Sequence, residues 1–180
     1  MADKFQDKYR ISSARLKGWN YTRSAAYFVT ICTRNREMLF GNIKDGKMEA
    51  TAIGNIAEQE WMKTPEVRPD MNLMLGQFVA MPNHFHGIML IGDNEYNGGA
   101  LDGRNAIHCR DAMHRDSTGG KPNTGVFGPQ SKNLASIMRG FKSSVTTHAR
   151  KMGDALFNWQ TRYHDHIIRD ADEYERIEPI

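Results

Sequence analysis

The sequence has few cysteines, no long apolar run and little net charge, and each shortage excludes a class of protein. Cys32 and Cys109 are too few for a disulfide framework or a cysteine metal site, so we interpret both as free thiols in a reducing compartment. No apolar stretch approaches the roughly 20 residues of a membrane-spanning helix. Residues 1–10 are polar and lack the apolar segment of a secretion signal. We therefore expect a cytoplasmic protein without a membrane partner.

The formal charge of +3 is small for a chain of 180 residues. It permits nucleic-acid binding but does not demonstrate it, because a strong electrostatic footprint requires clustered cations. The hydrophobic content of 39% and charged content of 25% fit a folded protein rather than a disordered one. The length suits one domain with a substantial core, and no internal repeat is present.

Local patterns predict the secondary structure of the first half. Aromatic and β-branched residues at 25–33 predict a strand. Asp45-Gly46, between alternating flanks, predicts a hairpin over 38–50. Thr51 is the expected N-cap of a helix that runs up to Pro65.

The second half continues with strands expected at 72–80 and 84–91. Ser131 is then the expected cap of a long helix ended by Gly153, followed by an extended segment at 159–169 and the start of a helix at 170. The apolar stripe of the long helix consists of Leu134, Ile137, Met138, Phe141 and Val145. This order predicts an α+β fold, an antiparallel sheet with helices packed on one face, compatible with the ferredoxin-like arrangement.

Two segments fall outside these elements. Residues 1–24 form a basic N-terminal arm, either a loose tail or a segment that touches phosphate. Residues 92–130 are rich in Gly, Asn, Asp and Ser and are expected to be a mobile insertion within a domain of residues 25–180. We interpret His108 and His114, which lie in it, as loop histidines rather than ligands.

The segment His84-Phe85-His86 carries the candidate chemistry. In a strand the two imidazoles share a face, and we expect Phe85 on the opposite face together with Ile88 and Leu90. Two imidazoles placed in this way can chelate one divalent metal. The alternative is an ordinary pair of surface or hydrogen-bonded histidines.

Four blocks of the chain, taken together, resemble the REP-associated tyrosine transposases, relatives of small insertion-sequence transposases. The His-hydrophobic-His pattern is similar to the HUH motif of these single-tyrosine enzymes. The blocks follow the family's order and cover most of the chain from about residue 25 onward: Tyr27–Thr33, Met81–Leu90, Lys132–Ser143 and Trp159–Arg169.

The resemblance implies a ferredoxin-like fold and an activity on DNA. It implies that His84 and His86 hold Mg²⁺ or Mn²⁺ against the scissile phosphate of single-stranded or hairpin DNA. A tyrosine would attack that phosphate and form a 5′-phosphotyrosine link, which conserves the bond energy for rejoining. Relatives among the insertion-sequence enzymes pair their active sites across a dimer, so the resemblance is compatible with a homodimer, and the sequence does not decide between monomer and dimer.

The family's nucleophile is not matched in this chain. Its Tyr-Ile-x-x-Asn-Pro segment falls in register at about Ile180, where the sequence reads Glu178-Pro179-Ile180. The asparagine or glutamine that completes the family's metal site is also unmatched, so we expect a truncated nucleophile helix. Tyr174 and Tyr163 are the fallback nucleophiles, and packing aromatics are the alternative for both.

Basic side chains outside the histidine segment are candidate DNA contacts: Arg139, Lys142, Arg162 and Arg169. A solvated surface with ordinary ion pairs is the alternative for each. His166 is expected to be a buried, hydrogen-bonded histidine rather than a supporting group of the metal site.

Three functions remain open on the sequence. The first is metal-dependent cutting and joining of single-stranded DNA. The second is a hairpin-binding module without a nucleophile. The third is an unrelated metal hydrolase in which His84 and His86 activate water, which requires a nearby carboxylate ligand that no motif supplies.

Overall fold

The computed structural model describes residues 4–5, 9–10, 16, 19–97 and 131–177. Cys109, His108, His114, most of the expected insertion at 92–130, and residues 178–180 lie outside the described residues. The first residues of the expected insertion are described. Among them Asn94 is buried, and its amide donates hydrogen bonds to the carbonyls of Met71 and Gly92.

The centre of the fold is a four-stranded sheet in which every neighbouring pair is antiparallel. Its spatial order is β6-β7-β3-β8, and the helices α1 and α3 separate the strands in the chain order β3-α1-β6-β7-α3-β8. This is the ferredoxin-like arrangement, and the predicted α+β class is confirmed. The bounds are β3 Ala25–Cys32, α1 Ala52–Val67, β6 Leu73–Met81, β7 His84–Ile91, α3 Leu134–Lys151, β8 His164–Ile168 and α4 Ala171–Ile177.

Several short elements lie outside the four-stranded sheet and its helices. A hairpin of β4 and β5 turns at Asp45 and Gly46, whose φ angles of 49° and 75° are those of the predicted turn. The remaining short elements are β1 Lys4–Phe5, β2 Tyr9–Arg10, η1 Arg34–Arg36, β4 Gly41–Lys44, β5 Lys47–Ala50 and η2 Pro69–Met71.

The helix starts follow capping chemistry. The Thr51 hydroxyl accepts from the Gly54 N–H at 3.1 Å, as predicted, and α1 continues two residues beyond Pro65. The prediction that Ser131 caps α3 is wrong. Asn133 is the N-cap. Its side-chain oxygen accepts a hydrogen bond from the Ser136 N–H at 3.0 Å, and the Ser136 hydroxyl accepts one from the Asn133 N–H.

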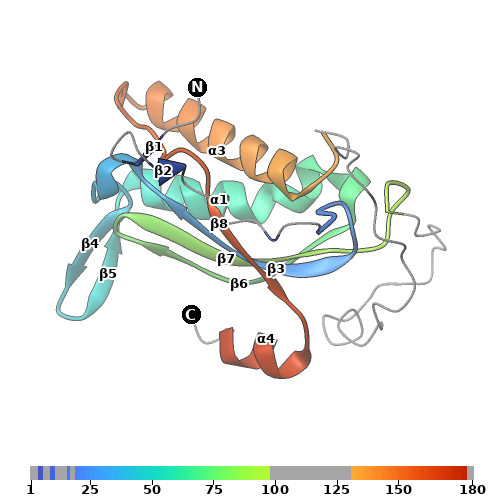
Figure 1. The fold of residues 1–180 in the computed structure, drawn as a ribbon. Helices are drawn as coiled ribbons and strands as arrows, with labels where there is room; N and C mark the ends of the chain where they lie inside the picture. The colour runs from blue at the N-terminus through green and yellow to red at the C-terminus, as the bar shows by residue number, and fades with distance from the viewer. Residues whose placement is uncertain (1–3, 6–8, 11–15, 17–18, 98–130, 178–180) are drawn as a thin grey trace.

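The main core lies between the sheet and the two long helices (Figure 1). Trp61 of α1, Phe85 of β7 and Phe141 of α3 meet there with ring centroids 5.1 to 5.5 Å apart. The predicted apolar stripe of α3 is buried in this core. Phe85 therefore anchors the histidine strand from the helical side.

The opposite face of the sheet carries a smaller apolar cluster that α4 covers (Figure 1). Tyr174 and Ile177 of α4 pack there against buried Ile88 and Leu90. The expectation that Ile88 and Leu90 share the Phe85 face is wrong. The register between β3 and β7 is unbroken from Ala25 to Cys32, so strict alternation places both residues on the face of His84 and His86.

The end of the expected basic arm packs on the domain. Trp19 and Tyr21 lie against the main core, Thr22 is buried, and the Trp19 indole N–H donates to the Tyr27 hydroxyl at 3.1 Å. Residues 19–24 are thus part of the folded domain rather than a loose tail. In the part of the chain that the structure describes, no helix has the length and apolarity to cross a membrane.

Candidate functional site

His84 and His86 lie side by side at the start of β7. Their ring centroids are 4.5 Å apart, with the ring planes nearly perpendicular at 80°. Phe28 of β3 stacks on the His86 ring at 5.2 Å and 17°. Both imidazoles are partly exposed and project from a strand that Phe85 fixes in the core. The site is therefore mounted on a rigid element.

Hydrogen bonds orient both rings. The His84 Nδ1 lies 2.7 Å from the side-chain oxygen of Asn83, and an amide oxygen only accepts, so Nδ1 carries the proton. The Thr30 hydroxyl lies 2.8 Å from the His86 Nδ1 and favours the same tautomer when it accepts. For His84 this leaves the lone pair on Nε2, the pattern in which a supporting group prepares a histidine for a metal.

Burial and neighbouring positive charge favour the neutral form of both imidazoles. Burial lowers the pKa of His84, and the Arg36 guanidinium lowers it further. Burial also lowers the pKa of His86, with a second contribution from His84. Neutral imidazole is the form that binds metals. Among the described residues no group of three or more His, Cys, Asp or Glu side chains could hold a metal, so a cation here would take further ligands from water or phosphate.

The two fallback tyrosines lie on opposite faces of the sheet. Tyr174 packs in the cluster on the histidine face. A Cβ atom added at Gly76 would lie 2.9 Å from the Tyr174 hydroxyl and 3.0 Å from Ile88, which places that hydroxyl against β6 and β7. Tyr163 packs instead against the main core on the helical side. Tyr174 is therefore the fallback that shares a face with the histidine pair.

One carboxylate attaches the start of α4 to the end of β8. Glu173 Oε1 lies 2.7 Å from His166 Nε2, and Glu173 Oε2 accepts from the Arg169 N–H at 2.8 Å. The predicted hydrogen bond of His166 is present, but its expected burial is wrong, because 48% of its side chain is exposed. The His166 ring serves to hold α4 and is not part of the His84–His86 pair.

The four basic candidates lie on three segments of the chain: Arg139 and Lys142 on α3, Arg162 before β8 and Arg169 after it. The Lys142 ammonium donates to the carbonyls of Gln160 and Arg162 at 2.8 and 3.0 Å, so it ties α3 to the segment before β8. Burial lowers its pKa to about 8. Arg139 is exposed on α3, the Arg162 side chain is exposed, and Arg169 lies at the junction of β8 and α4.

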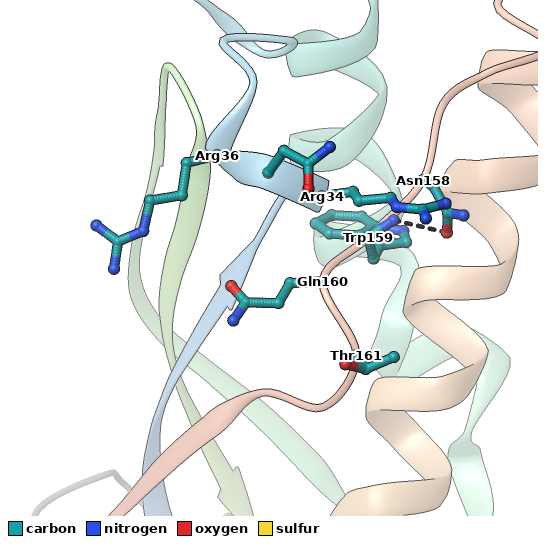
Figure 2. A pocket seen from close by; sticks show the side chains of 7 residues that line it. Arg34, Arg36, Asn158, Trp159, Gln160 and Thr161 are labelled. Carbon is teal, nitrogen blue, oxygen red and sulfur yellow. Dashed lines mark hydrogen bonds between the residues drawn. The ribbon is translucent and has the colours of Figure 1, made fainter. Parts of the chain in front are cut away.

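Sequence reasoning missed a cleft of about 670 Å³ between η1 and the segment before β8 (Figure 2). The short helix η1 provides Arg34, Asn35 and Arg36 on one side, and residues 158–161 provide the other. Asn35 and Arg36 both have left-handed backbones, with φ of 53° and 56°, and nothing in the local sequence predicts that conformation. The cleft brings together segments that are distant in the chain.

The fold and the site together define a ferredoxin-like α+β protein with a histidine pair on one sheet face. A solved structure of a REP-associated tyrosine transposase bound to a REP hairpin aligns with 93% of this chain and 68% of its own chain, at a TM-score of 0.53 and 18% sequence identity. That similarity shows a shared fold.

Sequence comparison gives the family. An uncharacterized protein of Haemophilus influenzae is 36% identical over 165 residues, which cover 92% of this chain and 82% of the relative. The chain belongs to the same protein family as that relative. No family model matches the chain.

Proposed function

We propose that this protein binds single-stranded DNA at hairpins and cuts and rejoins it through a covalent phosphotyrosine link, with Mg²⁺ or Mn²⁺ held by His84 and His86. The observation that carries the proposal is the pair of adjacent imidazoles on one strand face, each oriented by a hydrogen bond at Nδ1. The fold shared with a hairpin-bound transposase supports DNA as the substrate.

The reaction is a transfer of one phosphoryl group. A bound divalent cation would polarise the phosphoryl oxygen and orient the leaving 3′-oxygen. The tyrosine oxygen forms a bond to phosphorus and gives its proton to solvent. The bond from phosphorus to the 3′-oxygen breaks, and that oxygen takes up a proton. The 5′ end of the downstream strand is then linked to the protein, and a second 3′-hydroxyl can reverse the step.

Tyr174 is the side chain among the described residues that we assign to this attack. It lies on the histidine face, in a helix that follows β8 directly and runs back beneath the sheet (Figure 1). Tyr163 is on the other side of the sheet and serves as the matched control. Both are partly buried tyrosines, so their replacement by phenylalanine removes one hydroxyl each and little packing.

Covalent trapping tests the proposal. Single-stranded hairpin DNA, labelled at its 3′ end, is incubated with the protein and Mn²⁺ and then denatured in detergent. We expect a labelled protein band that Tyr174→Phe abolishes and Tyr163→Phe retains. The double substitution His84→Ala with His86→Ala should also abolish the band while the circular dichroism spectrum stays native, because both rings are surface groups of a strand anchored by Phe85.

Each contrary result has a distinct meaning. A label retained in Tyr174→Phe would place the nucleophile elsewhere in the 180 residues. Undiminished labelling in the histidine double variant would contradict the metal assignment. DNA that is bound by every variant and never becomes covalent would contradict cleavage and leave a hairpin-binding protein. A 5′-labelled strand is the control for polarity, since its label should not become attached.

A further inference from the structure

We infer that the cleft beside η1 and a second hollow behind residues 158–161 form one track for the phosphodiester backbone of a single DNA strand that leaves the histidine pair. This inference rests on the proposed function and assigns the surface that holds the strand next to the reacting phosphate. It adds Arg34 and Arg36, which the sequence does not nominate as DNA contacts.

Two hollows share one wall. The cleft of about 670 Å³ lies between η1 and residues 158–161. A hollow of about 360 Å³ lies between the same residues and α3, where its lining includes Lys142, Ser143, Thr146, Thr147 and Arg150. The shared wall is Asn158, Trp159, Gln160 and Thr161. The track therefore runs from η1 over this wall to α3.

The lining has the chemistry of a phosphate-binding surface. The lining residues of the two hollows are cationic, neutral polar or aromatic, and none of these described residues is acidic. The guanidinium groups of Arg34, Arg36 and Arg150 form no ion pair with any residue that the structure describes, and all three residues are exposed. Amide and hydroxyl groups on the wall add hydrogen-bond donors. Cations together with neutral donors suit phosphate and sugar oxygens.

The track is joined to the histidine pair through Asn83. Its side-chain N–H donates to the Arg36 carbonyl at 3.3 Å, and its side-chain oxygen accepts from His84 at 2.7 Å. Thr33 reinforces the junction, because its hydroxyl contacts the carbonyls of Asn83 and Glu37 at 2.9 and 2.7 Å. A strand with one phosphate at His84 therefore has its neighbouring phosphates within the reach of η1.

The η1 turn is held in an unusual shape. Two consecutive non-glycine residues, Asn35 and Arg36, have left-handed backbones. The Arg34 N–H donates to the Asn158 carbonyl at 3.0 Å, so the turn is attached to the wall of the cleft. Left-handed conformations persist where surrounding bonds enforce them, and they concentrate at binding sites. The arginines are thus presented by a fixed support.

The test measures the binding of fluorescently labelled single-stranded hairpin DNA by anisotropy, without metal, at several salt concentrations. We compare Arg34→Gln with Arg36→Gln, Arg150→Gln alone, and a control pair, Lys63→Gln with Lys132→Gln. The control removes the same charge as the arginine pair. Its residues lie on the later half of α1 and just before α3, outside both hollows.

We expect the arginine pair to weaken binding by tenfold or more near 0.1 M salt. The plot of log affinity against log salt has a negative slope, and its magnitude should decrease by about 1.4, since each contact to a single-strand phosphate contributes about 0.7. Arg150→Gln should lower the slope by about half as much, and the control pair should change neither quantity. Thermal melting confirms that each variant is folded, and Arg150→Gln tests the track independently of the η1 turn.

The outcomes separate the two proposals. Failure of the unsubstituted protein to bind any single-stranded hairpin would overturn the proposed function and the track together. Binding that the arginine pair and Arg150→Gln leave unchanged would overturn the track alone, as would an equal loss in the control pair. Displacement of the DNA by polyglutamate at equal charge concentration would assign the track to acidic proteins and overturn it as a DNA surface.

Discussion

Gly87 lies on β7 directly after His86, and the space where its side chain would project is filled by Trp61. A Cβ atom at Gly87 would lie 2.5 Å from the Trp61 indole, which is completely buried. The missing side chain allows α1 to lie close against the strand that carries the histidines. The support of the site therefore depends on one close approach between a helix and a strand.

We expect Gly87→Ala to lower the free energy of unfolding by about 1–3 kcal/mol, the usual cost of overpacking a core. Urea denaturation of the two proteins measures the difference. Gly140→Ala is the matched control, because a Cβ atom at Gly140 on α3 meets nothing within 4 Å. That substitution should raise the free energy of unfolding by about 0.5–1 kcal/mol. A loss of similar size in both variants would contradict the assigned contact.

At the residue scale, the sequence predicts which side chains form the candidate site better than it predicts their hydrogen-bond partners. The shared face of His84 and His86 follows from the alternation of a strand. Their bonds to Asn83 and Thr30 depend on a turn and on a neighbouring strand. Ile88 was expected on the face of Phe85, but the alternation of side chains along a strand places it on the face of His84 and His86.

Helix α4 has seven residues and is attached to the sheet by an apolar contact and by Glu173. The Arg169 N–H and the His166 ring both bond to the Glu173 carboxylate, and these bonds lower its pKa. A carboxyl group whose folded pKa lies below its unfolded value stabilises the fold fully above the unfolded pKa. That contribution is lost as the pH falls through the folded pKa.

We therefore expect Glu173→Gln to destabilise the protein at pH 7 by an amount that stays constant down to about pH 4.5 and then shrinks toward zero at lower pH. Urea denaturation of both proteins at several pH values measures this difference. Asp172→Asn on the exposed side of the same helix is the control. A difference that persists at the lowest pH would show that the two bonds do not depend on the charge.

Elements with local signals were predicted well, and elements that depend on distant partners were not. The turn at Asp45-Gly46 and the cap at Thr51 are encoded by adjacent residues, and both are present. The start of α3 was misplaced because Ser131 and Asn133 are both good caps, and the reciprocal bond to Ser136 selects the second. The helix η1 has no local signal, since distant bonds hold its left-handed residues.

At the scale of the whole molecule, one face of the sheet packs in the main core and the other carries the candidate site. One face packs against α1 and α3, while the other has an apolar half under α4 and a polar half that contains the histidine pair. β3 and β7 are the inner strands, and β6 and β8 are the edges. The histidines thus belong to a strand that is hydrogen-bonded on both sides.

We expect the backbone amides of β3 and β7 to exchange with deuterium most slowly, because these strands open only when the sheet unfolds. The amides of α4 and of the β4–β5 hairpin should exchange much faster. Native-state hydrogen exchange read by mass spectrometry gives the order. Exchange in β7 as fast as in α4 would contradict a rigid mount for the histidines.

The whole fold was predictable because the order of its strands and helices leaves few compact solutions. The cleft was not, since η1 follows β3 and residues 158–161 precede β8, and only the pairing of these distant strands brings the two segments together. A basic surface assembled from two distant segments has no signature in the local sequence.

A final consequence follows from the bonds between α3 and the wall of the track. The Trp159 indole N–H donates to the Lys142 carbonyl at 3.0 Å, and the Lys142 ammonium donates to the carbonyls of Gln160 and Arg162. Because these hydrogen bonds run in both directions between the two segments, we expect residues 158–161 to move together with α3. A force on a DNA strand bound over residues 158–161 would then act on α3, whose apolar side is buried in the core.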